Sequence, residues 1–195
     1  MNMVHAIQQS TTLEKKKTAE CLIEPITFEF KDSLFEYSVY KPSSRFLRDF
    51  DTIFPSLKEK KELLVVPIIQ KCKFDMVGLT KEANEERDIK LEIFVEWGKL
   101  VVKRIESIGM WADIMDPASG FPILSEAGPS PYPDVQGTYM LASSRFSIQN
   151  VGCCHILLHP KWFSFIYPST LFTTAPADIL EKVINEVNDA FLLTP

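Results

Sequence analysis

Two adjacent cysteines and a histidine, Cys153-Cys154-His155, stand at the start of an apolar run in the last third of the chain. The alternation of the run predicts a strand, in which successive side chains point to opposite faces. Cys154 would then share an apolar face with Ile156 and Leu158, whereas Cys153 would share the opposite face with His155. We therefore expect Cys154 to be buried and Cys153 to be presented.

The chemistry that Cys153 could perform is metal binding. A cysteine thiolate is a soft ligand for transition-metal centres, and the thiol must lose its proton to bind. A nearby positive charge favours the thiolate, and His155 would lie on the same strand face at about 6.5 Å. Since a histidine is positive only part of the time near neutral pH, binding through Cys153 would depend on pH.

A zinc site built from Cys153, His155 and His159 is a weaker alternative. His159 is far along the strand from Cys153, and the sequence offers no evident fourth ligand, although structural zinc sites have four. A cysteine on a strand is more often a small buried apolar side chain, an interpretation that fits Cys154, Cys72 and Cys21. A disulfide between the neighbours Cys153 and Cys154 would be strained.

Asp113 and Asp116 could suggest acid–base chemistry. They are three positions apart in a predicted strand and therefore point to opposite faces, so their carboxyl groups do not converge. The segment Asp116 to Gly120 is typical of a turn in which the aspartate accepts backbone hydrogen bonds. We expect a structural role for both aspartates. The alternative that they also help to shape a surface for a partner protein stays open.

The elements that position these residues alternate irregularly between strands and helices. Strands are predicted over residues 26–30, 34–40, 63–70, 111–116, 145–148, 151–159 and 162–167, and helices over about 43–54, 85–108 and 175–191. Hairpins early and late in this order favour the α+β class. A flexible tail is expected over 1–23, followed by one domain over 24–195.

Three details of this pattern carry separate expectations. Trp97 falls on the apolar stripe of the longest helix and is expected in the core. Pro67 lies within the third strand, which suggests an edge strand or a bulge. The segment 121–140 is rich in proline and lacks periodicity, so it predicts a long loop.

Composition excludes several classes of function. The chain has 195 residues, 46% hydrophobic and 24% charged, as in ordinary globular proteins, and its net charge of −5 disfavours nucleic-acid binding. The longest apolar run is far short of the roughly 20 residues that span a bilayer. Phosphate-binding loops, a nucleophile elbow and Cys-x-x-Cys motifs are absent from the sequence, so nucleotide-binding, hydrolase and thiol–disulfide activities lack support.

The start of the chain indicates where the protein resides. It has no continuous apolar signal, and its first arginine is Arg45, whereas mitochondrial presequences are rich in arginine. Four cysteines without scaffold spacing fit a reducing compartment. We expect a cytoplasmic protein, and a longer precursor would allow mitochondrial import.

Three motifs in a fixed order resemble those of one known family. They are Trp111–Gly120, Gly152-Cys153-Cys154 and Leu171–Pro176. They are similar to the Trp-Ala-Asp…Asp-Pro-Ser-Ser-Gly, Gly-Cys-Cys and Phe-Thr-Asn-Ala-Thr-Pro stretches of the cobalamin-trafficking family of methylmalonic aciduria and homocystinuria type D. The likeness extends from about residue 33 to residue 185.

The resemblance implies a non-catalytic adaptor. In the family, the first cysteine of the pair, here Cys153, binds the cobalt of cobalamin presented by the type C trafficking protein, and the cofactor then goes to methionine synthase and methylmalonyl-CoA mutase. Cobalamin is thus shared with the partner in a heterodimer. This chain has His155 where family members carry lysine, which affects how the thiolate is stabilised.

The resemblance also implies a fold like that of flavin-dependent nitroreductases, without a required flavin. The chain has no Asp-x-His, the motif with which many cobalamin enzymes supply a histidine to cobalt. Two alternatives stay open: a flavin-type reductase that kept its activity, and an interaction module in which Cys153 is inert.

Overall fold

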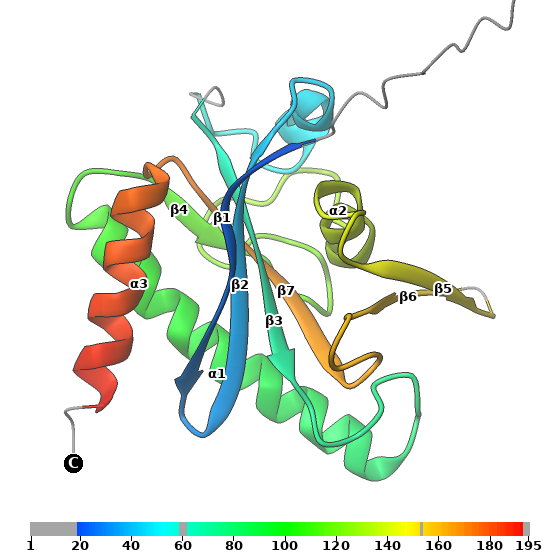
Figure 1. The fold of residues 1–195 in the computed structure, drawn as a ribbon. Coiled ribbons are helices and arrows are strands. Elements are labelled where there is room, and N and C mark those ends of the chain that lie inside the picture. Colours follow the sequence, from blue (N-terminus) through cyan, green and yellow to red (C-terminus); the bar gives the residue numbers. More distant parts are fainter. Residues whose placement is uncertain (1–18, 59–61, 153, 193–195) are drawn as a thin grey trace, which may run out of the picture.

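The computed structural model describes residues 19–58, 62–152 and 154–192, which form a mixed α+β domain (Figure 1). A five-stranded sheet has the order β1-β2-β3-β7-β4, all neighbours being antiparallel, and β5 and β6 form a separate two-stranded sheet. The α+β class is therefore confirmed. The elements are β1 (Ala19–Phe30), β2 (Ser33–Pro42), the 3₁₀ helix η1 (Phe46–Thr52), β3 (Leu64–Lys71), α1 (Lys81–Glu106), β4 (Ala112–Ile114), α2 (Asp134–Leu141), β5 (Ser147–Val151), β6 (Cys154–Leu158), β7 (Ile166–Thr173) and α3 (Ala177–Leu192).

The large sheet is covered on both faces, because its strands are apolar on both faces. Val66 and Ile68 of β3 pack on the side of α1 and α3, whereas Val65 and Ile69 pack on the side of η1 and α2. This is the period of two that a strand imposes. In Figure 1, α1 and α3 lie on one side of the sheet, and α2 with the β5–β6 hairpin lies on the other.

Trp97 lies at the centre of the first of these two cores. Its side chain is fully buried, as predicted, and stacks obliquely against Phe35 with ring centroids 5.7 Å apart. Its indole Nε1 donates a hydrogen bond to Oδ1 of Asn188 at 3.2 Å. The indole therefore joins α1 to both the sheet and α3.

The first hairpin confirms the prediction of two strands joined by a tight turn. Lys31 and Asp32 form the turn with φ values of 48° and 57°, the positive values that a two-residue hairpin of type I′ requires. The predicted tail to residue 23 is too long, since β1 already begins at Ala19. Shifts in register between Cys21 and Ile26 hide the regular alternation that would have revealed this part of the strand.

Pro67 does not mark an edge, because β3 is the central strand of the sheet. Its pairing with β7 is continuous, and Pro67 itself faces Thr170. Its pairing with β2 is interrupted between Tyr37↔Ile68 and Tyr40↔Val65, and the register is the same on both sides of the gap. The missing proline N–H thus interrupts one ladder locally without producing a bulge.

The predicted loop over 121–140 is wrong at its end, where α2 forms. Pro133 precedes the helix in an extended conformation, and Asp134 stands in its first turn. The helix buries Gly137, Thr138 and Leu141 along with this aspartate. Polar and small residues on the buried side leave no apolar stripe, so the periodicity that usually reveals a helix is absent.

Candidate functional site

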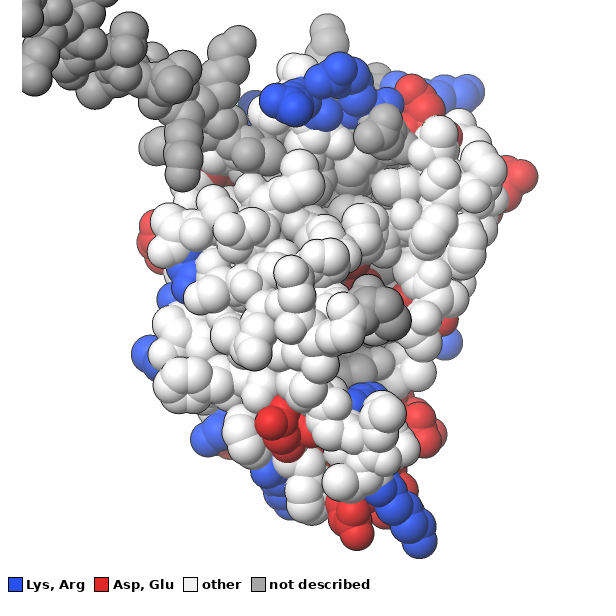
Figure 2. Space-filling model, turned by 90° about the vertical axis from the view of Figure 1, so that its right-hand side faces the viewer, with Lys and Arg blue, Asp and Glu red and all other residues white. Residues whose placement is uncertain are grey.

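Two adjoining cavities lie where α2, β6 and the turn after β4 meet. Their volumes are about 210 and 430 Å³. Both are lined by Pro117, Asp134, Val135 and His155, and we call the region around these four residues the α2–β6 cleft. Figure 2 views the molecule from this side, and its centre is largely free of charged side chains, which gather above and below.

The residues that follow the predicted metal ligand in the sequence belong to this region. Cys153 itself lies outside the described residues. Gly152 before it is exposed, with φ of +59°, and Cys154 after it lines the larger cavity. His155 is exposed and lines both cavities. The structure therefore places the candidate modulator His155 in the wall of a cleft.

The predicted faces of the β6 strand are wrong. Cys154, expected to be buried, is exposed, as is Cys21 on β1, whereas Leu157 and His159 are buried with exposed fractions of 3% and 1%. The predicted strand 151–159 is also divided: Val151 and Cys154 pair at the end of a hairpin. The prediction assigned Ile156 and Leu158 to the buried face because both are hydrophobic. It assigned the opposite face to solvent because that face carries histidine.

His159 can be buried because its ring nitrogens have partners. Nδ1 accepts hydrogen bonds from the backbone N–H groups of Lys161 and Trp162, at 3.1 and 3.0 Å. Since Nδ1 accepts, Nε2 carries the proton, and it lies 3.1 Å from Oε1 of Glu36. Neither nitrogen is left for a metal, so His159 does not serve the zinc alternative. Within the described ranges no cluster of three metal-ligating side chains occurs.

Glu36 connects His159 to Arg145. The same oxygen, Oε1, accepts a hydrogen bond from Nη2 of Arg145 at 2.6 Å. Burial raises the pKa of Glu36, but the hydrogen bonds from His159 and Arg145 outweigh it, so the net pKa lies below its usual value. The cluster of Glu36, Arg145 and His159 ties the base of the hairpin to β2 and is structural.

Asp113 and Asp116 have the structural roles predicted for them. Asp113 is fully buried and accepts three backbone hydrogen bonds, from Ile114, Leu124 and Ser125, at 2.7, 3.1 and 2.7 Å. Asp116 accepts from the N–H of Ala118 at 3.0 Å and from a serine hydroxyl at 2.6 Å. The first aspartate fixes the segment after β4, and the second closes the turn that forms one wall of the cleft.

Sequence reasoning missed Asp134, which is the buried acid of the cleft. Its exposed fraction is 8%, and its Oδ1 accepts a hydrogen bond from the hydroxyl of Thr170 on β7. Burial raises its pKa to about 7, the Thr170 hydrogen bond acts in the opposite direction, and the charge of Asp116 adds to the increase. The Pro-Asp pair at the start of α2 was the one signal in the sequence, and it indicates a helix start rather than a site.

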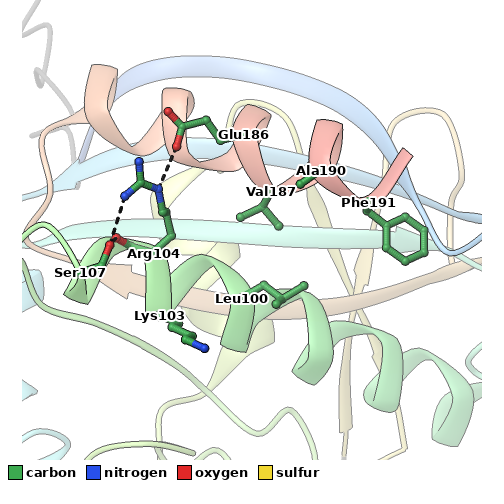
Figure 3. A pocket seen from close by; sticks show the side chains of 8 residues that line it. All are labelled: Leu100, Lys103, Arg104, Ser107, Glu186, Val187, Ala190 and Phe191. Carbon is green, nitrogen blue, oxygen red and sulfur yellow. Dashed lines mark hydrogen bonds and ion pairs between the residues drawn. The ribbon is translucent and has the colours of Figure 1, made fainter. Parts of the chain in front are cut away.

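A further cavity of about 600 Å³ lies on the other side of the sheet, between α1 and α3. Figure 3 shows Leu100 of α1 opposite Val187 and Phe191 of α3, with the ion pair between Arg104 and Glu186 at one end. No described cysteine or histidine lines this cavity. This groove is therefore separate from the candidate site.

Among the described residues, no helix is both long enough and apolar enough to cross a bilayer.

Comparison with known proteins identifies the family. The family model described as methylmalonic aciduria and homocystinuria type D protein matches residues 1–185. The protein named cobalamin trafficking protein CblD from Mus musculus is 28% identical over 154 residues, which cover 76% of this chain and 49% of the relative. The Homo sapiens protein of that name is 27% identical over 161 residues, covering 79% and 52%, and the Gallus gallus protein is 29% identical over 154 residues, covering 76% and 49%.

This chain thus spans about half the length of the curated relatives that it matches. The match of the family model nevertheless includes all three sequence motifs and the whole α2–β6 cleft. The chain therefore belongs to the family of methylmalonic aciduria and homocystinuria type D proteins.

Proposed function

We propose that this chain is an adaptor for cobalamin trafficking that has no catalytic step of its own. The observation that carries the proposal is its membership of the family, whose curated members are named for cobalamin trafficking. Cys154 of the Gly-Cys-Cys motif lines a cleft with a largely uncharged surface, which suits contact with another molecule.

In this proposal Cys153 supplies the ligand to cobalt. Its thiolate binds the cobalt of cobalamin that the type C trafficking protein presents. His155 is exposed in the wall of the cleft and, when protonated, favours the thiolate through its charge. Thiolate binding would be a ligand exchange, in which the thiol proton passes to solvent and the cobalt–sulfur bond replaces the bond to the ligand that leaves, so it requires no oxidant or reductant.

The size of the cleft supports sharing of the cofactor between two proteins. The two cavities measure about 210 and 430 Å³. Sites that enclose a drug-sized ligand have volumes of about 300–1,000 Å³, and cobalamin is considerably larger than such ligands. The chain alone therefore contacts part of the corrin, and the partner holds the rest in a heterodimer.

Further parts of the proposal concern destination and fold. The adaptor delivers cobalamin to methionine synthase and methylmalonyl-CoA mutase, acting in the cytoplasm, with a longer form acting in mitochondria. Its domain resembles the nitroreductase fold but works without flavin. A purified chain with the yellow colour and absorbance of a bound flavin would contradict this last part.

The decisive experiment is an absorbance titration of cobalamin bound to the type C protein. Wild type and the Cys154→Ala variant should both produce the spectral change of a cobalt–sulfur bond, whereas Cys153→Ala should not. Cys154→Ala is the matched control, because it removes a neighbouring exposed thiol. A full spectral change with Cys153→Ala would refute the proposed ligand.

A further inference from the structure

The carboxyl group of Asp134 has unused hydrogen-bonding capacity. Thr170 donates to Oδ1, and within the described ranges no hydrogen bond to Oδ2 is formed. The side chain is more than nine-tenths buried and lines both cavities of the cleft. Oδ2 is not one of the completely buried, unpaired polar atoms of the described residues, so it is open to the cavity, where a ligand can complete its hydrogen bonds.

The walls around Asp134 select a neutral ligand. Most of the larger cavity is lined by uncharged residues, among them Pro117, Pro131 and Val135. Arg87 lines the smaller cavity, but its guanidinium group donates to the backbone carbonyl groups of Met76 and Gly78 and to Asn84. The arginine is thus committed to the loop before α1 and does not neutralise Asp134.

We propose that the α2–β6 cleft binds a primary carboxamide through Asp134. The acid form of Asp134 donates from Oδ2 to the carbonyl oxygen of the carboxamide. Oδ1, which has two lone pairs, accepts from the carboxamide N–H as well as from Thr170. An acid and a primary carboxamide are complementary in this way, because each has one donor and one acceptor side by side. A tertiary amide lacks the N–H and cannot form the pair.

The carboxamide belongs to the rim of the corrin ring. This step rests on the proposed function, in which the cobalt of cobalamin is bound at Cys153. Cobalamin carries primary carboxamides on side chains around its ring. Cys154 and His155, which follow the proposed cobalt ligand in the sequence, line the same cavity as Asp134. A corrin bound at this end of the hairpin therefore presents a rim carboxamide to the cleft.

A small amide tests the site without cobalt. Propionamide titrated into the ¹⁵N-labelled chain should cause saturable NMR shifts at the backbone signals of Asp134, Val135 and Thr170. N,N-dimethylpropionamide should not cause them, and neither should propionamide with the Asp134→Ala variant. Asp134→Asn presents a donor and an acceptor of the same shape, so it should keep the response. Asp189→Ala, which removes an exposed aspartate on α3, is the control.

Two results of this titration would overturn the site. One is the absence of saturable shifts in the wild-type cleft. The other is an equal response to the primary and the tertiary amide. Cobalt takes no part in this measurement, so its result is independent of the proposed function. The carboxamide site can be confirmed when the cobalt–sulfur band fails to appear, and it can be refuted when the band appears.

A second arm tests whether the corrin is the source. Partner-bound cobalamin, and derivatives with one rim carboxamide converted to a carboxylate, are titrated with wild type and Asp134→Ala. Wild type should bind the derivative that lacks the recognised carboxamide roughly tenfold more weakly than it binds cobalamin. Asp134→Ala should bind that derivative and cobalamin equally well. If both proteins discriminate equally among all derivatives, the corrin is not the source, and an asparagine or glutamine of the partner takes its place.

Discussion

Nε2 of His159 lies 3.1 Å from Oε1 of Glu36, so the end of the β5–β6 hairpin is held by a strand more than a hundred positions earlier in the chain. The histidine ring also stacks on Trp162, with ring centroids 4.3 Å apart and an interplanar angle of 18°. Both side chains of the hydrogen-bonded pair are at least 95% buried. The hairpin that carries the candidate site is therefore fixed by polar contacts at its base.

Removal of Glu36 should strongly destabilise the protein. The Glu36→Ala variant leaves His159 buried without its acceptor and Arg145 without its carboxylate, and breaking a buried pair in this way costs about 3–5 kcal/mol. Urea unfolding followed by circular dichroism measures the loss. Glu92→Ala, which removes an exposed glutamate on α1, should change the free energy of unfolding by less than about 0.5 kcal/mol. Similar values for the two variants would show that the cluster contributes little.

Asp134 should make the protein less stable as the pH rises. Its pKa is about 7 in the folded state and near the ordinary 3.8 in the unfolded chain. Between these values the folded state holds a proton that the unfolded state has lost, so the free energy of unfolding falls with increasing pH. The slope is at most about 1.4 kcal/mol per pH unit.

The Asp134→Asn variant isolates this effect. The difference in free energy of unfolding between wild type and Asp134→Asn should shift against wild type from pH 4.5 to pH 7.5. Asp116 and His155 also face the carboxyl group, and both are retained in the variant. A difference that stays constant over this range would mean that Asp134 titrates as an ordinary exposed acid.

The cysteines should differ sharply in reactivity. Burial raises the pKa of Cys72 to about 12, and the nearby Glu86 adds to the increase, so this thiol carries almost no thiolate at pH 8. Cys154 is exposed. Iodoacetamide treatment of the folded protein at pH 8, followed by peptide mass spectrometry, should find the label at Cys154 and not at Cys72. Urea should abolish the difference, and rapid labelling of Cys72 in the folded state would contradict its burial.

Gly98 should not tolerate a methyl group, although alanine favours helices. A Cβ atom at this position would lie 2.8 Å from both Cδ1 and Cγ2 of Ile114, where α1 crosses β4. Overpacking costs about 1–3 kcal/mol, against a gain of about 1 kcal/mol in helix propensity. Gly98→Ala should therefore lower the thermal midpoint. In the Ile114→Ala background the same change should be neutral or stabilising, and a loss of equal size there would exclude the clash as the cause.

The sequence predicted the parts of the fold whose stabilisation is local or periodic. The first hairpin, the long helix around Trp97 and the closing helix were each recognisable from alternation or from an apolar stripe. The turn at Asp116 was recognisable from its side-chain chemistry. These signals depend on neighbours within a few positions, and a single sequence contains them.

The parts that failed depend on contacts between distant segments. The burial of His159 depends on Glu36, and only the fold brings these two residues together. Asp134 lay in a segment predicted to be a loop and was not singled out, and its partner Thr170 lies beyond the strand predicted over 162–167. The face of Cys154 was wrong for the same reason: a buried polar residue reverses the expected hydrophobic pattern.

The anchoring of the hairpin has a mechanical consequence. Leu157 and His159 fix one end of the β5–β6 hairpin against the sheet, while the end at Val151 and Cys154 is exposed and projects from the body of the molecule (Figure 1). The hairpin is thus anchored at one end only. A small rotation about the anchored end displaces the projecting end more than any other part of the hairpin. A molecule that engages the projecting end can adjust its position there, and the five-stranded sheet does not have to deform.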